Sequence, residues 1–214
     1  AFGYENLLPE IPQISTIGDE SSAEKIRRKI SEILVGLGMN EVSSYHITTK
    51  EEQFGKMGMK AIGFVEVEES KTEYSILREN LSHFMMKILS ENIDAEYPQK
   101  IFETGKVFGI DSKGNLMERE SLAVAVSPGN FTDMRQAVEY LAESIDRKIA
   151  FNESDESPEY FVEGRVAELI FQNKRIGFAG EVHPKILRNW KIKMPVALLE
   201  ISLDEIYESL MEKG

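Results

Sequence analysis

The sequence predicts an α+β fold in which an antiparallel β-sheet is flanked by helices. Stretches that alternate between apolar and polar residues come mostly as neighbouring pairs joined by turn residues, which is typical of β-hairpins. Stretches with apolar residues three and four positions apart, typical of amphipathic helices, are inserted between these pairs. Hairpins separated by helices favour this architecture over a doubly wound parallel sheet.

The chain opens with an arm, residues 1–20, that has no helical period and carries Pro9 and Pro12 three positions apart. We expect this arm to be extended and to wrap against another surface. Residues 21–214 are expected to form a single core domain. Its first helix is marked by the capping-box spacing of Ser21 and Glu24 and is ended by Gly38. The apolar face of this helix consists of Ile26, Ile30, Ile33, Leu34 and Leu37.

The middle of the chain predicts two alternating strands, a helix and a hairpin. The strands cover residues 41–48 and 62–69, and the helix runs from about Ser75 to Ile93. The hairpin spans residues 100–127 and turns at residues 111–114, where Asp and Gly provide a turn signal. The elements expected after it are a helix over 131–147, a loop over 152–159, a hairpin over 164–183 that turns at Asn173-Lys174, a short helix from Pro184, a strand over 195–203 and a helix from Asp204.

Composition excludes several classes of protein. The 214 residues are 42% apolar, enough for a core, and none of them is Cys, so disulfides, thiolate metal sites and a Cys nucleophile are ruled out. This suits a reducing cytoplasm. No apolar run approaches the roughly 18 to 20 residues of a membrane helix. The net charge of −12 argues against a freestanding nucleic-acid binder, because phosphate contacts require a basic face.

Candidate catalytic residues are few. The three histidines, His46, His83 and His183, lack the spacing of metal ligands, and no P-loop or Gly-x-Ser-x-Gly motif is present. Glu181 and His183 lie two positions apart, so on a strand they would share a face and could act as acid and base. We favour a structural role for both, because no nucleophile or partner base is visible nearby and His183 could cap the helix that Pro184 begins.

Several phrases occur in an order that resembles one family. They are "AFGYENLLPEIP", "LRENLSHFMMKILSENI", "YPQKIFETGKVF", "EYFVEGRVAELIF", "IGFAGEVHPKIL" and "PVALLEISLDEI". The chain is similar to the C-terminal part of phenylalanyl-tRNA synthetase β chains of the archaeal and eukaryotic type. The resemblance implies a class II synthetase-like domain without activity, in a heterotetramer of two α and two β chains. The α chain would carry the working site, and the complex would use Mg and ATP and bind tRNA(Phe). This chain alone would hold no cofactor.

Departures from the class II motifs support an inactive domain. The second motif has the form Phe-Arg-x-Glu, and here Glu103 follows Ile101 where the Arg is expected. The third motif is Gly-rich and ends in Arg, whereas residues 196–206 contain neither residue type. The first motif, which forms an interface, keeps Glu41 and Val42 but has Tyr45 in place of Pro. By analogy, the subunit interface is expected to include Ile26, Ile30, Glu41, Val42 and Tyr45, and the structural residues are expected to be Glu103, Glu181, His183 and Pro184.

Two other functions stay open. A freestanding ligase that uses ATP to activate a carboxylic acid would need a phosphate-binding arginine from another position, and the candidates are Arg78, Arg119 and Arg165. A general interaction domain unrelated to synthetases would lack the class II topology. An apolar patch that is exposed when the α chain is absent would also favour self-association of the isolated chain.

Overall fold

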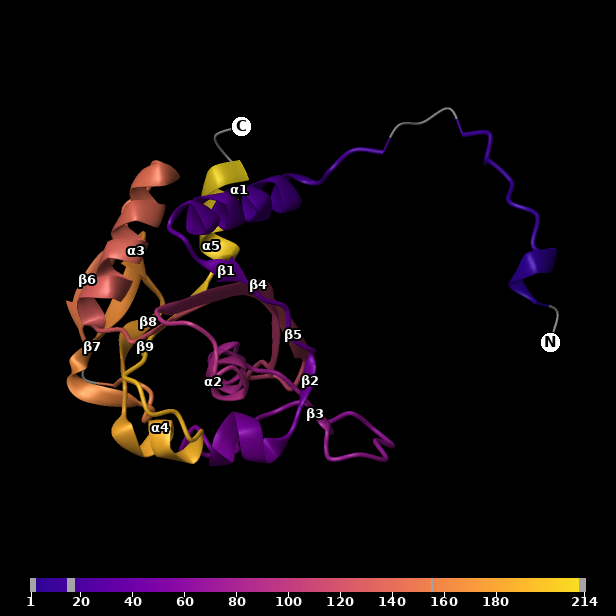
Figure 1. The fold of residues 1–214 in the computed structure, drawn as a ribbon. Helices are drawn as coiled ribbons and strands as arrows, with labels where there is room; N and C mark the ends of the chain where they lie inside the picture. The colour runs from indigo at the N-terminus through magenta and orange to yellow at the C-terminus, as the bar shows by residue number, and fades with distance from the viewer. Residues whose placement is uncertain (1–2, 15–17, 155, 212–214) are drawn as a thin grey trace.

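A seven-stranded sheet forms the centre of the computed structural model, which describes residues 3–14, 18–154 and 156–211 (Figure 1). Its first pair, β1 and β4, is parallel, and all the other neighbours are antiparallel. The predicted α+β architecture is therefore confirmed, with one parallel pair that hairpin patterns do not predict. In spatial order the strands are β1 (Asn40–Glu41), β4 (Gln99–Ile110), β5 (Leu116–Ser127), β9 (Ala197–Ser202), β8 (Lys174–Val182), β7 (Phe161–Phe171) and β6 (Ala150–Glu153).

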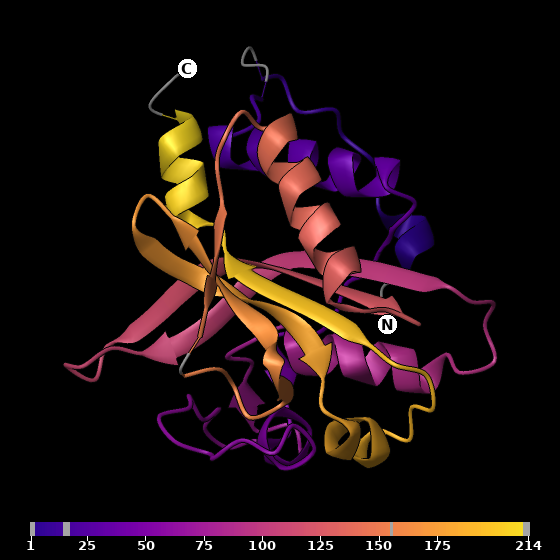
Figure 2. The ribbon, with the colours of Figure 1, turned by 90° about the vertical axis from the view of Figure 1, so that its left-hand side faces the viewer.

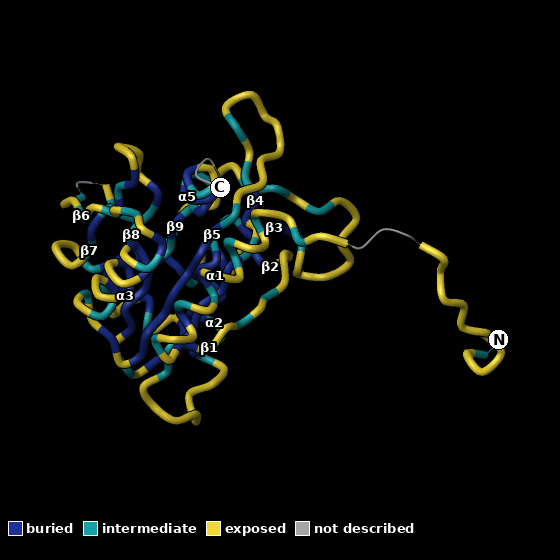
Figure 3. The backbone as a smooth tube through the Cα atoms, turned by 90° about the horizontal axis from the view of Figure 1, so that it is seen from above, coloured by how far each residue is buried: buried dark blue, intermediate teal, exposed yellow. Residues whose placement is uncertain are grey.

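Helices cover both faces of this sheet (Figure 2). One face carries α1 (Ser22–Gly36), α3 (Phe131–Ser144) and α5 (Asp204–Met211). The other carries α2 (Ser82–Glu91) and α4 (Pro184–Asn189). Strand β5 supplies both layers, because successive side chains of a strand point to opposite faces: Leu122 and Val124 enter the first core and Ala123 and Ala125 the second. Two buried faces explain why the central strands are largely buried in Figure 3.

Local signals located the first helix and both hairpins, but the second hairpin turns at Gln172-Asn173 and not at Asn173-Lys174, because β8 already begins at Lys174. The Ser21 hydroxyl accepts a hydrogen bond from the Glu24 N–H at 3.2 Å, and Gly38, with φ of 74°, follows the end of α1. In the first hairpin the Asp111 carboxylate accepts from the Lys113 and Asn115 N–H groups, each at 2.8 Å. Such local contacts need no tertiary partner, which is why the sequence alone could predict them.

The second helix starts later than predicted. Strand β3 (Ile76–Leu77) pairs with β2 (Ile47–Thr48) in a separate two-stranded sheet. The Leu77 N–H donates to the Val65 carbonyl, and the Arg78 N–H to the His46 carbonyl, both at 2.9 Å. Because these backbone groups bond to other segments, the expected helix from Ser75 begins only at Ser82.

Two predicted strands and one loop need correction. Of residues 41–48, only Glu41 and β2 are in strands, because Ser44 donates its N–H to the Glu103 carboxylate at 3.2 Å and not to a neighbouring strand. Of residues 62–69, only Glu66 forms an isolated bridge. The loop expected over 152–159 is shorter at its start, because β6 extends to Glu153 and pairs with β7. A π-helix, Glu51–Gly55, was not predicted.

The described part of the arm is exposed. Residues 4–6 form a short 3-10 helix, and residues 7–14 are extended. Residues 1–2 and 15–17 of the predicted arm lie outside the described residues. That the arm wraps against another surface stays a prediction. Its large apolar side chains, all more than half exposed, are Tyr4, Leu7, Leu8, Ile11 and Ile14. Within the described chain, no helix combines the length and apolar character needed to cross a bilayer.

Candidate functional site

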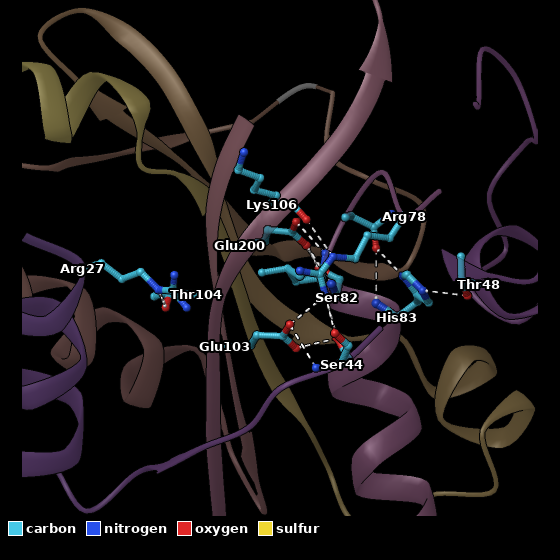
Figure 4. Close-up of polar contacts among 12 residues, drawn as sticks. Arg27, Ser44, Thr48, Arg78, Ser82, His83, Glu103, Thr104, Lys106 and Glu200 are labelled. Atoms are coloured by element: carbon cyan, nitrogen blue, oxygen red, sulfur yellow. Dashed lines mark hydrogen bonds and ion pairs between the residues drawn. The ribbon is translucent and has the colours of Figure 1, made fainter. Parts of the chain in front are cut away.

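A buried ion pair joins the segment before α2 to strand β4 (Figure 4). The Arg78 Nη1 atom lies 2.7 Å from Glu103 Oε1, and the two side chains are 1% and 3% exposed. Arg78 also donates from Nε to the Lys106 carbonyl at 2.7 Å and from Nη1 to the Ser44 hydroxyl at 2.8 Å. The Ser44 hydroxyl in turn donates to Glu103 Oε2 at 2.6 Å. Both charges are thus fully engaged inside the chain, as a buried pair requires.

The glycine two residues after Glu103 is required by this ion pair. A Cβ atom at Gly105 would collide with the Arg78 guanidinium. Ile101 lies two residues before Glu103 on the same face of β4 and is buried in the core beneath α2. The side chain of Ile101 is therefore committed to apolar packing.

A second carboxylate, the half-buried Glu200 on β9, lies at the start of α2 (Figure 4). It accepts hydrogen bonds from the Leu81 N–H at 2.9 Å, the Ser82 N–H at 2.8 Å and the Ser82 hydroxyl. These amides are among those that a helix N-terminus leaves without partners, and the helix dipole favours a negative group there. Burial raises the pKa of Glu200. Sequence reasoning missed this cap because its two parts are 118 residues apart.

His83 is held neutral inside the protein. Its two ring nitrogens lie 3.0 Å from Asn80 Oδ1 and 3.1 Å from the Thr48 hydroxyl. Burial, assisted by the nearby charges of Arg78 and Lys87, lowers the pKa of His83 from 6.5 to about 3. In the part of the chain that the structure describes, no group of three or more His, Asp or Glu residues is placed to hold a metal ion.

Glu181 and His183 make separate contacts at two helix starts. Glu181 lies 2.6 Å from Arg165 and accepts a hydrogen bond from the Phe131 N–H at the first residue of α3, at 3.3 Å. The His183 Nδ1 atom accepts from the Lys185 N–H at 3.1 Å and caps α4, with Pro184 as the first helical residue. The structure therefore does not bring the two side chains together as an acid and a base.

The expected interface residues divide into two sets. Ile30 is fully buried and Ile26 packs beside it in the chain's own first core, while Val42 packs against the second core. Ile30 leaves no surface for a partner, so that part of the expectation is wrong, whereas a partner contact of the half-buried Ile26 and Val42 stays a prediction. Glu41 is exposed and accepts a hydrogen bond from the Ser31 hydroxyl, and Tyr45 is 82% exposed.

The three alternative arginines also differ. Arg78 is committed to Glu103, and Arg165 pairs with Glu181 while keeping 64% of its side chain exposed. Arg119 lies on the exposed half of β5, on the face that carries α2, and borders a cavity. Within the described residues it makes no hydrogen bond or ion pair.

Residues 8–203 match the family model described as the phenylalanyl tRNA synthetase beta chain CLM domain. The chain belongs to this family. Three similar curated relatives are the phenylalanine–tRNA ligase beta subunits of Thermococcus sibiricus, Pyrococcus abyssi and Archaeoglobus fulgidus, at 35%, 32% and 34% identity. Each match covers 97% of this chain and 38% of the relative, so the chain spans well under half the length of these β subunits.

A solved structure shows the same fold. PylSc of Desulfitobacterium hafniense, a pyrrolysyl tRNA synthetase, matches with a TM-score of 0.70 over 90% of this chain and 67% of that chain. At 16% identity the likeness concerns the fold alone. The seven-stranded sheet flanked by helices is thus a class II synthetase-like fold within the phenylalanyl-tRNA synthetase β-chain family.

Proposed function

We propose that this chain is a non-catalytic, class II synthetase-like module of a phenylalanine–tRNA ligase β chain. It scaffolds the catalytic α chain and helps to position tRNA(Phe) for ATP-dependent aminoacylation in the cytoplasm. The observation that carries this proposal is the Arg78–Glu103 pair. Glu103 corresponds to the glutamate of the second class II motif, and an arginine of the same chain neutralises it in a site closed to solvent.

The nucleotide-binding positions support the same proposal. Ile101 is buried in the core, where a guanidinium would be needed to stabilise phosphate charge. Between Val196 and Ile206, which include β9 and the start of α5, the sequence has no Gly and no Arg. Mg and ATP therefore belong, in this proposal, to the parent complex and not to this chain.

The proposed α-facing surface is centred on Glu41 and Tyr45. Both are exposed in the single chain, and they lie where the first class II motif forms an interface. The complex would be a heterotetramer of two α and two β chains. Glu181, His183 and Pro184 are proposed to be structural, since their contacts lie at the starts of α3 and α4. We propose residues 1–20 as an arm and 21–214 as one core domain.

An alternative is a freestanding ligase that activates a carboxylic acid with ATP. Arg119 is the observation that favours it, because this side chain makes no hydrogen bond or ion pair within the described residues and borders a cavity on the sheet. Arg78 cannot serve the same purpose without breaking the buried ion pair.

Titration calorimetry tests the two functions. The chain is titrated with Mg-ATP and then with a purified α chain. The scaffold proposal predicts no heat with ATP and a tight one-to-one complex with α, weakened in Tyr45→Ser. Saturable ATP binding that is lost in Arg119→Gln but kept in Arg135→Gln, a surface arginine on α3, would establish the alternative instead.

A further inference from the structure

A cavity of about 570 Å³ lies over β5, β9 and β8, on the face of the sheet that carries α2. Arg119 and Phe178 contribute to it from the sheet, and Glu79 and Asn80 come from the segment before α2. The loop at residues 59–63 and the segment at 158–160 border it as well. None of these groups is needed for the scaffold role proposed above.

Two opposite charges, Arg119 and Glu79, border this cavity and lie close enough to influence each other electrostatically. Within the described residues, the side chains of Arg119 and Glu79 make no hydrogen bond or ion pair with any group. The positive charge of Arg119 lowers the pKa of Glu79, but partial burial of this carboxyl outweighs it and the pKa is raised overall. Glu200 also borders the cavity, but its carboxylate is already occupied by the start of α2.

The rest of the lining is largely apolar. Ile62, Val107 and Phe178 are among the lining side chains, and Met59 lies at one side. A ligand pocket typically combines such an apolar wall with a few polar groups that fix orientation. A molecule with one ammonium, one carboxylate and an apolar side chain matches all three features at once.

We propose that this cavity binds a free α-amino acid with an apolar side chain, its carboxylate on Arg119 and its ammonium on Glu79. A guanidinium recognises a carboxylate through two parallel hydrogen bonds, and an ammonium favours the ionised form of the glutamate it contacts. This site is independent of the proposed α-facing surface, so either proposal can fail alone.

The ligand's two charges are tested first, by calorimetric titration of the 214-residue chain. The probes are L-leucine and L-phenylalanine, with N-acetyl-L-leucine and L-leucinamide as matched derivatives that lack the ammonium or the carboxylate. At least one of the amino acids is expected to bind saturably, and for L-leucine each derivative should bind about tenfold or more weakly, since a hydrogen bond to a charged group is worth that much. No saturable binding up to about 10 mM, a concentration well above weak small-ligand Kd values, would overturn the proposal.

The residue assignment is tested with charge-neutral variants. Arg119→Gln should bind L-leucine and L-leucinamide equally weakly, and Glu79→Gln should do the same for L-leucine and N-acetyl-L-leucine. The control is Glu118→Gln, which removes a charge from the next position of β5, where Glu118 pairs with Lys106. Wild-type binding in both cavity variants would overturn the proposal. The proposal would also be overturned if both variants lowered the free energy of unfolding while the wild-type chain bound no amino acid. Arg119 and Glu79 would then stabilise the fold through their mutual attraction.

Discussion

The guanidinium of Arg78 and the carboxylate of Glu103 lie 2.7 Å apart, with their side chains 1% and 3% exposed. They are 25 residues apart in the chain. A buried pair of this kind adds little net stability, because both ions lose their hydration, but loss of one partner leaves the other uncompensated. The pair therefore constrains both the fold and any use of either residue in chemistry.

Removing Arg78 alone should be costly. Arg78→Met is expected to lower the free energy of unfolding by about 3–5 kcal/mol, because Glu103 would be left charged and buried. Replacing both residues, with Arg78→Met and Glu103→Leu, should recover most of the loss. Urea denaturation monitored by circular dichroism measures both. Equal stability of the single variant and the wild type would show that the site is open to water.

The long-range cap of α2 should be visible in amide exchange. Glu200→Ala removes the acceptor for two amides and should cost about 1–3 kcal/mol, the usual penalty for stranding buried polar groups. Exchange at Leu81 and Ser82 should accelerate more than exchange in α3. Glu208→Ala, at an exposed position of α5, is the control and should change neither quantity. Unchanged exchange at Ser82 would contradict the capping role.

Stability should fall in acid because of His83. The unfolded chain binds a proton at this residue near pH 6.5, whereas the folded chain resists it until about pH 3. Between these values the unfolded state holds more protons, so His83 costs up to about 1.4 kcal/mol of stability for each unit that the pH falls. Glu79 and Glu200, whose pKa values are raised, act in the opposite direction. The measurement is therefore the difference between wild type and His83→Gln, which should shrink from pH 6.5 to 4. If the free energies of unfolding of the wild type and His83→Gln changed in parallel with pH, the result would count against a neutral, buried His83.

Replacement of His183 distinguishes a cap from a catalytic base. His183→Ala should lower the free energy of unfolding by about 0.5–2 kcal/mol, the usual cost of losing a helix cap, and His183→Asn should restore most of it. Thermal denaturation gives both values. In the complex with an α chain, aminoacylation should be the same for His183→Asn and wild type. A large loss of turnover in the stable Asn variant would return His183 to the catalytic candidates.

The first helix and the loop after β1 should respond differently to substitution. Ile30→Ala should destabilise the chain by about 2–5 kcal/mol, because Ile30 is fully buried in the core of the single chain. Tyr45→Ser should change stability by no more than about 0.5 kcal/mol, as exposed positions usually do, yet weaken binding of the α chain. Denaturation and calorimetry on the same samples separate the two effects. Full α binding by Tyr45→Ser would place the interface elsewhere.

The sequence by itself determined the elements whose signals are local. Ser21 caps α1 through an amide three residues away, and Asp111 closes its turn within four residues. These contacts form between near neighbours, so residue type and spacing suffice to predict them. The same is true of Pro184 at the start of α4. Family membership, too, was visible in ordered sequence phrases and is confirmed by the match over residues 8–203.

Only the tertiary structure decided which charges meet. Three long-range contacts join segments far apart in the chain. They are the ion pair of Arg78 with Glu103, the hydrogen bond from Ser82 to Glu200 and the parallel pairing of β1 with β4. The sequence pattern near Arg78 predicts a helix. The backbone there is extended, because the Leu77 and Arg78 N–H groups donate to the carbonyls of Val65 and His46. Local propensity contributes less than a buried hydrogen bond left unmade, so packing overrode the pattern at this point. For the same reason Ile30 faces inward and Tyr45 outward, a distinction that depends on what each element packs against.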